Sequence, residues 1–313
     1  MSTFATVLRD QVQGYIKMRH ALGYGFRKQA SILRAFQRYV ETYRFAGPLT
    51  QKMALEFSLG TDRTPNGCAI CYAVLRCFSE YLAIIDARTE ALDPRALRRF
   101  RAIPPPRILN DDELARLMSA SARITPKEPH RGRTLATLLG LLASTGLRSG
   151  EALRLDRADV DLVTGVLHIR KTKFRKDRLV PVHATTLTAL QRYAKQRDLS
   201  FPVSKAAAFF LSVRGTRLSS AALYYLLGKA CARAGLNEHA ARALRPHDLR
   251  HRFAVVRLAE WHRQKLDVQA QLPVLATYLG HARYTDTAYY VTAAPELLSL
   301  AAQRAFGMAG GTL

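Results

Sequence analysis

The sequence predicts a mainly α-helical protein with a small β-sheet, divided into two domains. Apolar residues recur at helical spacing through most of the 313-residue chain. Three prolines at 104–106 interrupt that pattern, and one later stretch, around residues 165–182, looks like two paired strands. We therefore expect a helical domain at 1–103, a proline-rich linker at 104–109 and a mixed α/β domain at 110–313.

The first domain is predicted to consist of helices that carry basic residues on their outer faces. The stretch "FRKQASILRAFQRYVETYRF" places one set of apolar residues on a single helix face: Ile32, Leu33, Phe36 and Val40. A second apolar-striped helix is expected in "GCAICYAVLRCFSEYLAII". Its Cys68 and Cys71 form one CxxC pair with no second pair, so we interpret them as buried, reduced thiols and expect no metal site.

The second domain begins with a helix start signal. Asn110 and Glu113 have the spacing of an N-cap and a capping box. The apolar stretch "RTLATLLGLLAS" predicts a buried helix that ends at Thr145-Gly146. "GVLHI" and "RLVPV" predict a β-hairpin with the basic tip "KTKFRKD". Further helices are expected at 184–197, 219–234, 247–263, 272–280, 285–291 and 295–306.

The charge balance indicates an acidic partner. There are 48 Lys and Arg against 24 Asp and Glu, which gives a net charge of +24 and a pI near 10.5. Nucleic acid is the expected partner, because basic side chains that neutralise phosphates release counterions. An anionic membrane surface is the weaker alternative. No apolar signal core is evident at the start, and the apolar run "LATLLGLLASTGL" is too short to cross a bilayer, so we expect a cytoplasmic protein.

Four stretches concentrate unusual polar chemistry. "STGLRSGEALRL" places Arg148 between two apolar helices, three residues before Glu151. The hairpin tip and the residue after it carry five cations: Lys171, Lys173, Arg175, Lys176 and Arg178. "RPHDLRHRFAVV" puts His247 and Arg250 on one helix face. "YLGHARYTDTAYYV" carries His281 and three tyrosines. Each stretch alone also fits an ordinary explanation, namely a surface ion pair, a solvated basic turn, a structural His–Arg pair or an aromatic helix face.

Taken together and in this order, the four stretches resemble the tyrosine recombinase (integrase) family. The matching motifs are "TGLRSGEAL", a lysine in a basic hairpin before "RLVPV", "HDLRH", and "LGH" with a tyrosine nine residues later. The resemblance covers roughly residues 107–300. It implies double-stranded DNA as the partner, a helical core-binding domain that clamps it and a catalytic domain that cuts it. The cut leaves a 3′-phosphotyrosine and a free 5′-hydroxyl, and it needs no metal, ATP or other cofactor.

The resemblance also implies roles for five residues. Arg148 and Arg250 would bind the non-bridging oxygens of the scissile phosphate. His247 would act as an acid, base or hydrogen-bond partner near the nucleophile. His281 would bind a non-bridging oxygen and pack the site. Glu151 would support these groups by orienting them.

The basic hairpin would supply the proton for the leaving 5′-oxygen. Lys173 aligns best with the lysine that does so in the family, and Lys171 and Lys176 are the alternatives. Most of the other cations at the tip are expected to be solvated and to touch the DNA backbone. The expected DNA contacts are Lys171, Arg175 and Lys176 in the hairpin, and Arg27 and Lys28 in the first domain.

The spacing from His281 selects one tyrosine as the nucleophile. Nine residues after His281 is Tyr290. Tyr289 points about 100° away on a helix, so we do not expect it to attack the phosphate. Tyr284 is expected in the turn before that helix, where it would pack or touch the DNA backbone.

The C-terminal segment bears on assembly and biological role. The amphipathic stretch 295–306 is expected to form an oligomerisation helix that docks onto a neighbouring protomer, although it could also pack on its own domain. The implied assembly is a homo-tetramer on paired recombination sites, either alone or with partner recombinases. The expected role is an integrase or transposase of a mobile element. The alternatives are a type IB topoisomerase and a non-enzymatic, architectural DNA-binding protein.

Overall fold

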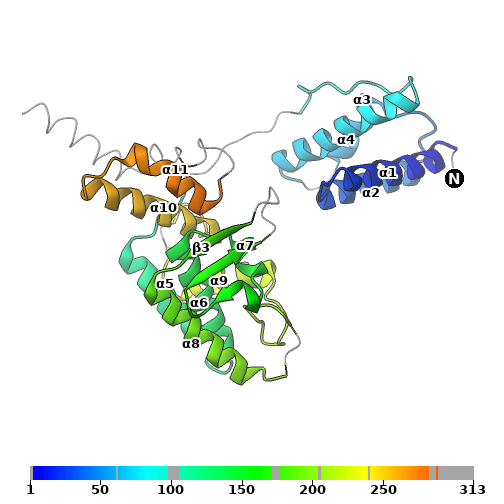
Figure 1. Cartoon of the computed structure of the whole chain (residues 1–313). Helices are drawn as coiled ribbons and strands as arrows, with labels where there is room; N and C mark the ends of the chain where they lie inside the picture. The colour runs from blue at the N-terminus through cyan, green and yellow to red at the C-terminus, as the bar shows by residue number, and fades with distance from the viewer. Residues whose placement is uncertain are drawn as a thin grey trace, which may run out of the picture. The chain divides into compact units, whose positions relative to one another are not determined.

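The chain folds into two compact units, Met1–Pro104 and Pro105–Leu313. The structure, a computed structural model, describes residues 3–60, 63–97, 106–170, 177–203, 206–238, 240–281 and 287. Within these ranges it is mostly helical and contains one small three-stranded sheet (Figure 1). The predicted fold class, mainly α with a small β-sheet, is therefore confirmed.

The N-terminal unit is built from helices. They are α1 (Thr3–Ala21), α2 (Arg27–Thr42), α3 (Gln51–Leu59) and α4 (Pro65–Ile85). On α2, Leu33, Phe36 and Val40 are fully buried in the core of this unit, as their spacing predicts. Ile32 is only partly buried at the edge of that core. The buried face of α2 is thus narrower than the predicted apolar face.

Helix α4 supplies much of the same core. Its buried residues include Cys71, Tyr72, Leu75 and Phe78. Within the described ranges, α4 is the helix whose length and apolar composition would also allow it to cross a membrane, but half of it is buried inside the unit. Core packing accounts for that composition. Cys68 and Cys71 are buried free thiols, which agrees with the interpretation of the CxxC pair.

The second unit contains the sheet. Strands β1 (Val160–Asp161), β2 (Val166–Ile169) and β3 (Arg178–Pro181) follow in order, and each pair is antiparallel. Val166 pairs with Pro181 and Ile169 with Arg178, so the predicted hairpin is confirmed. The hairpin tip at 171–176 lies outside the described residues.

The rest of the described second unit is mostly helical. The bounds of these helices are α5 (Asp111–Ala122), α6 (Pro129–Thr145), α7 (Ser149–Arg154), the short 3-10 helix η1 (Arg157–Asp159), α8 (Ala184–Ser200), α9 (Ser220–Arg233), α10 (Pro246–Arg263) and α11 (Val268–Leu279). The predicted capping box of Asn110 and Glu113 starts α5. Helix α6 is the central one, with buried leucines on several sides and contacts to α5, α8 and α10.

Helix α11 differs from its predicted bounds of 272–280. It begins earlier, at Val268, because the side chain of Asp267 accepts hydrogen bonds from the backbone N–H groups of Gln269 and Ala270. Pro273 lies inside the helix. A proline usually argues for a helix boundary, but one near the start of a helix removes few backbone bonds. Of the predicted helices 285–291 and 295–306, only the helical residue Thr287 is described.

Candidate active site

Three arginines meet at the C-terminal end of α11. Arg178 Nε donates to the carbonyl of Tyr278 at 3.1 Å, and Arg250 Nη2 donates to the carbonyl of Leu279 at 2.9 Å. Both Nη atoms of Arg148 donate to the carbonyl of Gly280 at 3.1 Å. The last carbonyls of a helix have no partner within it and carry the negative end of its dipole. Three consecutive carbonyls therefore fix three guanidinium groups in one place.

Arg250 is the most deeply buried of the three. It lies on α10, is 1% exposed, and donates a second bond from Nη1 to the carbonyl of Gly146 at 2.8 Å. Gly146 ends α6 with a φ of +63°, and a Cβ there would lie 2.6 Å from Phe253 Cδ1 and 2.8 Å from Leu279 Cδ2. Only glycine lets the end of α6 come this close to α10 and α11. That close approach presents the Gly146 carbonyl to Arg250.

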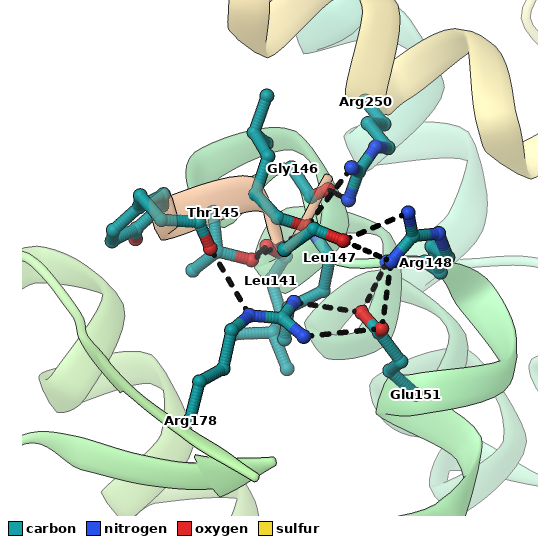
Figure 2. Close-up of polar contacts among 11 residues, drawn as sticks. Leu141, Thr145, Gly146, Leu147, Arg148, Glu151, Arg178 and Arg250 are labelled. Carbon is teal, nitrogen blue, oxygen red and sulfur yellow. Dashed lines mark hydrogen bonds and ion pairs between the residues drawn. The ribbon is translucent and has the colours of Figure 1, made fainter. Parts of the chain in front are cut away.

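Glu151 lies between the other two arginines, as Figure 2 shows. Its Oε1 accepts from Arg148 Nη1 at 3.0 Å and from Arg178 Nη1 at 3.2 Å. Its Oε2 accepts from Arg178 Nη2 at 2.9 Å and from the backbone N–H of Arg148 at 3.1 Å. The last bond caps α7, so one carboxylate both starts a helix and joins two guanidiniums.

The protonation state of Glu151 follows from these contacts. The residue is only 4% exposed, and burial by itself raises the pKa of its carboxyl. Hydrogen bonds from Arg178 and the charges of Arg178 and Arg148 outweigh burial, so the net shift of the pKa is downward. Glu151 is therefore an ionised carboxylate at neutral pH.

Three histidines adjoin the arginines. Burial, followed by the charges of Arg250 and Arg148, lowers the pKa of His281 to about 3 and that of His247 to about 4. His247 keeps an exposed side, where solvent weakens this effect. The ring of His251 packs edge-on against His247 with centroids 4.6 Å apart, and burial lowers the pKa of His251 to about 4. All three imidazoles are neutral at pH 7.

His281 is placed directly by the end of α11. Its backbone N–H donates to the carbonyl of Ala276 at 2.9 Å, which continues the helix-end hydrogen bonds past Gly280. Its Nδ1 lies 2.6 Å from the hydroxyl of the buried Thr287. The ring is therefore held on one side, and α11 orients it together with the arginines.

The structure brings most of the predicted site residues within its described part together. Arg148, Glu151, His247, Arg250 and His281 come from α7, α10 and the end of α11, which are far apart in sequence. Five predicted residues lie outside the described residues: Lys171, Lys173, Arg175, Lys176 and Tyr290. The remaining two, Arg27 and Lys28, are exposed in the first turn of α2, in the other unit.

Arg178 is the residue whose place in the site the sequence interpretation missed. It was grouped with the solvated cations of the hairpin, yet its side chain is only 12% exposed. A signal was present, because side chains two apart on a strand face the same side, and Arg178 is two residues before the apolar Val180. Val180 is fully buried. The strand period therefore directs Arg178 inward.

The donor set at the end of α11 is suited to an anion. Across the described ranges, no three His, Cys, Asp or Glu side chains come together as a group that could hold a metal ion. The charged groups here are instead dominated by guanidiniums, with one carboxylate and neutral imidazoles. Such a set suits an anionic group with several oxygens, such as a phosphate diester.

Residues 107–296 match the model of the phage integrase family. The chain belongs to this family, whose members are the tyrosine recombinases. The predicted family resemblance is thereby confirmed, and with it the class of enzyme, one that breaks and rejoins DNA strands through a tyrosine.

Individual relatives agree with this membership. A Sinorhizobium fredii protein named as the integrase/recombinase y4rE is 60% identical over 98% of both chains. The fold is similar to that of the XerH site-specific recombinase bound to its difH substrate, with a TM-score of 0.65, 22% identity and coverage of 89% of this chain and 79% of that one. It is also similar to a lambda integrase tetramer bound to a Holliday junction, with a TM-score of 0.63, 18% identity and coverage of 90% and 76%.

Proposed function

We propose that this chain is a site-specific DNA recombinase, an integrase or transposase of a mobile element, that works through a covalent 3′-phosphotyrosine. The observation that supports this most directly is the arginine cluster at the end of α11, where backbone carbonyls fix Arg148 and Arg250 in a partly buried site. The family membership supplies the reaction class. The remaining steps follow from the chemistry of phosphoryl transfer.

The cluster suits the charge of a phosphoryl transition state. Three guanidiniums, from Arg148, Arg178 and Arg250, face one carboxylate, Glu151, so the group carries a net charge of about +2 by simple formal counting. Negative charge grows on the non-bridging oxygens as the nucleophile attacks. Donors that are already fixed stabilise that charge without reorganising. We assign Arg148 and Arg250 to these oxygens.

The neutral histidines complement the arginines. Nδ1 of His281 faces Thr287, so its other ring nitrogen is the one assigned to a non-bridging oxygen. His247 is assigned to proton exchange with the attacking phenol. A bound phosphate places negative charge beside both rings, which favours their protonated forms and raises their pKa values from about 3 and about 4.

The bond changes then balance without any further reactant. The phenol oxygen of Tyr290 attacks phosphorus, and its proton passes to His247 or to water. The bond from phosphorus to the 5′-oxygen breaks, and Lys173, or alternatively Lys171 or Lys176, gives that oxygen a proton. The product holds a 3′-phosphotyrosine and a 5′-hydroxyl. Attack by a 5′-hydroxyl on the phosphotyrosine reverses the sequence and rejoins a strand.

DNA binding and assembly extend the proposal beyond the site. Arg27 and Lys28 lie in the first turn of α2, where the positive end of the helix dipole adds to their charge. With the hairpin cations Lys171, Arg175 and Lys176, we assign them to DNA phosphates. We further propose a homo-tetramer on paired sites, linked through the segment 295–306 and open to partner recombinases.

The test is covalent trapping on nicked DNA. The test duplexes cover the DNA on both sides of the gene, and each carries a nick. After cleavage beside the nick, the short fragment diffuses away, so the strand cannot be rejoined and the adduct persists. We expect a protein–DNA adduct without metal or ATP. Tyr290→Phe should abolish it, and Tyr289→Phe, the matched control one residue away, should retain it. An adduct that survives Tyr290→Phe would refute the assigned nucleophile.

The same preparation distinguishes the other functions. A type IB topoisomerase would relax a supercoiled plasmid that lacks every trapped duplex sequence, whereas a recombinase would act only on plasmids that carry paired sites. An architectural protein would bind the duplexes and give no adduct with any of them. Either of those results would contradict the proposed recombinase.

A further inference from the structure

Arg178, at the start of β3, donates three hydrogen bonds to two partners. Its Nε donates to the Tyr278 carbonyl at 3.1 Å, and its two Nη atoms donate to the two oxygens of Glu151. At the other end of β3, the hydroxyl of Tyr278 donates to the carbonyl of Pro181 at 3.0 Å. Tyr278 thus ties both ends of the strand to α11. The guanidinium of Arg178 has a single fixed position.

Arg148 and Arg178 differ in their access to solvent. The side chain of Arg178 is 12% exposed and that of Arg148 is 32% exposed. A phosphate that approaches from solvent can therefore reach Arg148 more easily than Arg178. Arg178 instead directs both of its Nη groups at Glu151.

Hydrogen-bond donors from Arg148 and Arg178 occupy all the acceptor sites of the Glu151 carboxylate. A carboxylate offers about four lone-pair sites. Arg178 takes one on each oxygen, the backbone N–H of Arg148 takes one, and the side chain of Arg148 takes the fourth. Without Arg178, this buried carboxylate would have only Arg148 to compensate its charge. Arg148 would then form a two-pronged pair with Glu151, the strongest geometry open to it.

We propose that Arg178 is a positioning residue that shares Glu151 with Arg148 and so keeps the Arg148 guanidinium available to the scissile phosphate. The inference rests on the proposed function, because it takes the phosphate as the ligand of Arg148. It makes a distinctive prediction. Loss of Arg178 should be harmful mainly while Glu151 is charged, so that removing the charge of Glu151 should repair part of the damage.

The first experiment measures single-turnover adduct formation at saturating duplex, using the nicked duplex that traps the unaltered protein. Arg178→Met should lower the rate at least about tenfold, the size seen when a residue that orients a metal ligand is removed. Duplex affinity should change much less. Adding Glu151→Gln to Arg178→Met should then recover about threefold or more, a coupling typical of residues in contact. A further loss, or no recovery, would overturn the proposal.

The matched control is Arg170→Met. Arg170 lies on the same hairpin and pairs with Asp159, away from Glu151. The Arg170→Met variant removes one positive charge from the same hairpin, so it measures how much the loss of a charge by itself lowers the rate of adduct formation. We expect a weaker affinity but a rate at saturating duplex within about twofold, as for a charge that only positions DNA. Equal rates for Arg170→Met and Arg178→Met would count against a special role of Arg178.

A second experiment displaces Arg178 and keeps every charge. Gly280 has a φ of +68°, and a Cβ there would lie 2.7 Å from Arg178 Nη1. Gly280→Ala should therefore push the guanidinium off Glu151 and lower the rate as Arg178→Met does. Gly235→Ala is the control, because Gly235 has a φ of +65° but a Cβ there would come no closer than 3.8 Å to Arg116 Nη1, its nearest neighbour. Equal rates for these two variants would contradict the inference.

A third readout uses no DNA. Arg178→Met leaves a buried carboxylate undercompensated, and we expect its unfolding midpoint to fall by roughly 5–10 °C. Glu151→Gln should offset part of that fall, whereas additive losses would overturn the shared ion pair. If the unaltered protein gives no adduct, the proposed function fails. The unfolding midpoints of the two single variants and the double variant still test whether Arg178 and Glu151 form the ion pair. If Arg178→Met does not fold, the double variant and Gly280→Ala carry the test.

Discussion

The cations of the two units are held in opposite ways. In the C-terminal unit, Arg250 is 1% exposed and each Nη group points at a backbone carbonyl. In the N-terminal unit, Arg27 and Lys28 are exposed in the first turn of α2. The charges are alike, but their settings are not. Buried arginines give a fixed direction to the charge, and exposed ones give long-range attraction that salt can screen.

Because of this difference, substitutions of the buried arginines and of the exposed cations should affect different properties of the protein. A guanidinium that is fixed in a partly dry site stabilises a transition state, because no reorganisation is needed when charge develops. An exposed cation releases counterions on binding and affects affinity only. Rate at saturating DNA and affinity for DNA are therefore separate readouts for the two units.

The largest effect is expected for Arg250→Lys. A lysine cannot bind the carbonyls of Gly146 and Leu279 with a planar fork and also face a phosphate. The rate of adduct formation at saturating duplex should fall about 100- to 1,000-fold, while affinity changes little. The control is Arg257→Lys, an exposed position on the same helix α10, which should leave the rate nearly unchanged. Similar losses at both positions would break the distinction between fixed and exposed cations.

An intermediate effect is expected from pH. The pKa values of His251 and His281 lie at about 4 and about 3 in the folded chain, below the usual 6.5. Between pH 6.5 and these lower pKa values, the unfolded chain binds more protons than the folded chain. The stabilisation by the neutral histidines is therefore complete above pH 6.5 and is lost as the pH falls. After allowance for partial solvent exposure, the free energy of unfolding should drop by about 2 kcal/mol between pH 7 and pH 5.

The single tryptophan makes this measurement specific to one unit. Trp261 lies on α10, so its fluorescence during urea unfolding reports the C-terminal unit. His251→Gln should reduce the drop, and His20→Gln, at an exposed position on α1, should leave it intact. The pKa values of Glu151 and Asp248 are lowered, and these carboxylates lose their contribution only at more acidic pH. A flat response between pH 7 and pH 5 would contradict the buried, neutral histidines.

The smallest effect is expected from the exposed cations of α2. The double variant Arg27→Ala, Lys28→Ala should weaken duplex binding and reduce the slope of log affinity against log salt by about 1 for each phosphate that is no longer neutralised. The rate at saturating duplex should not change. Lys52→Ala on α3 serves as the control for removal of an exposed charge in the same unit, because the side chain of Lys52 is 86% exposed. An unchanged slope would remove Arg27 and Lys28 from the DNA surface.

Local sequence patterns predicted much of the fold correctly. Helix α5 begins where Asn110 and Glu113 predict it, and α6 ends at Gly146 as expected. The hairpin of β2 and β3 also matches its prediction. These features depend on neighbours within a few residues, so the sequence carries them directly. Helix α11 starts earlier than the predicted residue 272, because the side chain of Asp267 caps it at Val268.

The candidate site was only partly predictable for the same physical reason. Motif order indicated Arg148, Glu151, His247, Arg250 and His281, and the structure brings them together. The sequence interpretation groups Arg178 with the hairpin cations, most of which are expected to be solvated. Its partner Glu151 is 27 residues away and its partner Tyr278 is 100 residues away. No local pattern reports contacts over such distances.

By itself, the sequence determined the family and the mainly helical fold, indicated an acidic partner, and predicts Tyr290 as the nucleophile from its spacing to His281. These properties are written in composition and in short motifs. Only the tertiary structure decided how the charges are held. It showed that three carbonyls at the end of α11 bind three arginines, and that Glu151 is divided between two of them. Burial and hydrogen-bond direction set how a charge acts, and both arise only when distant segments pack together.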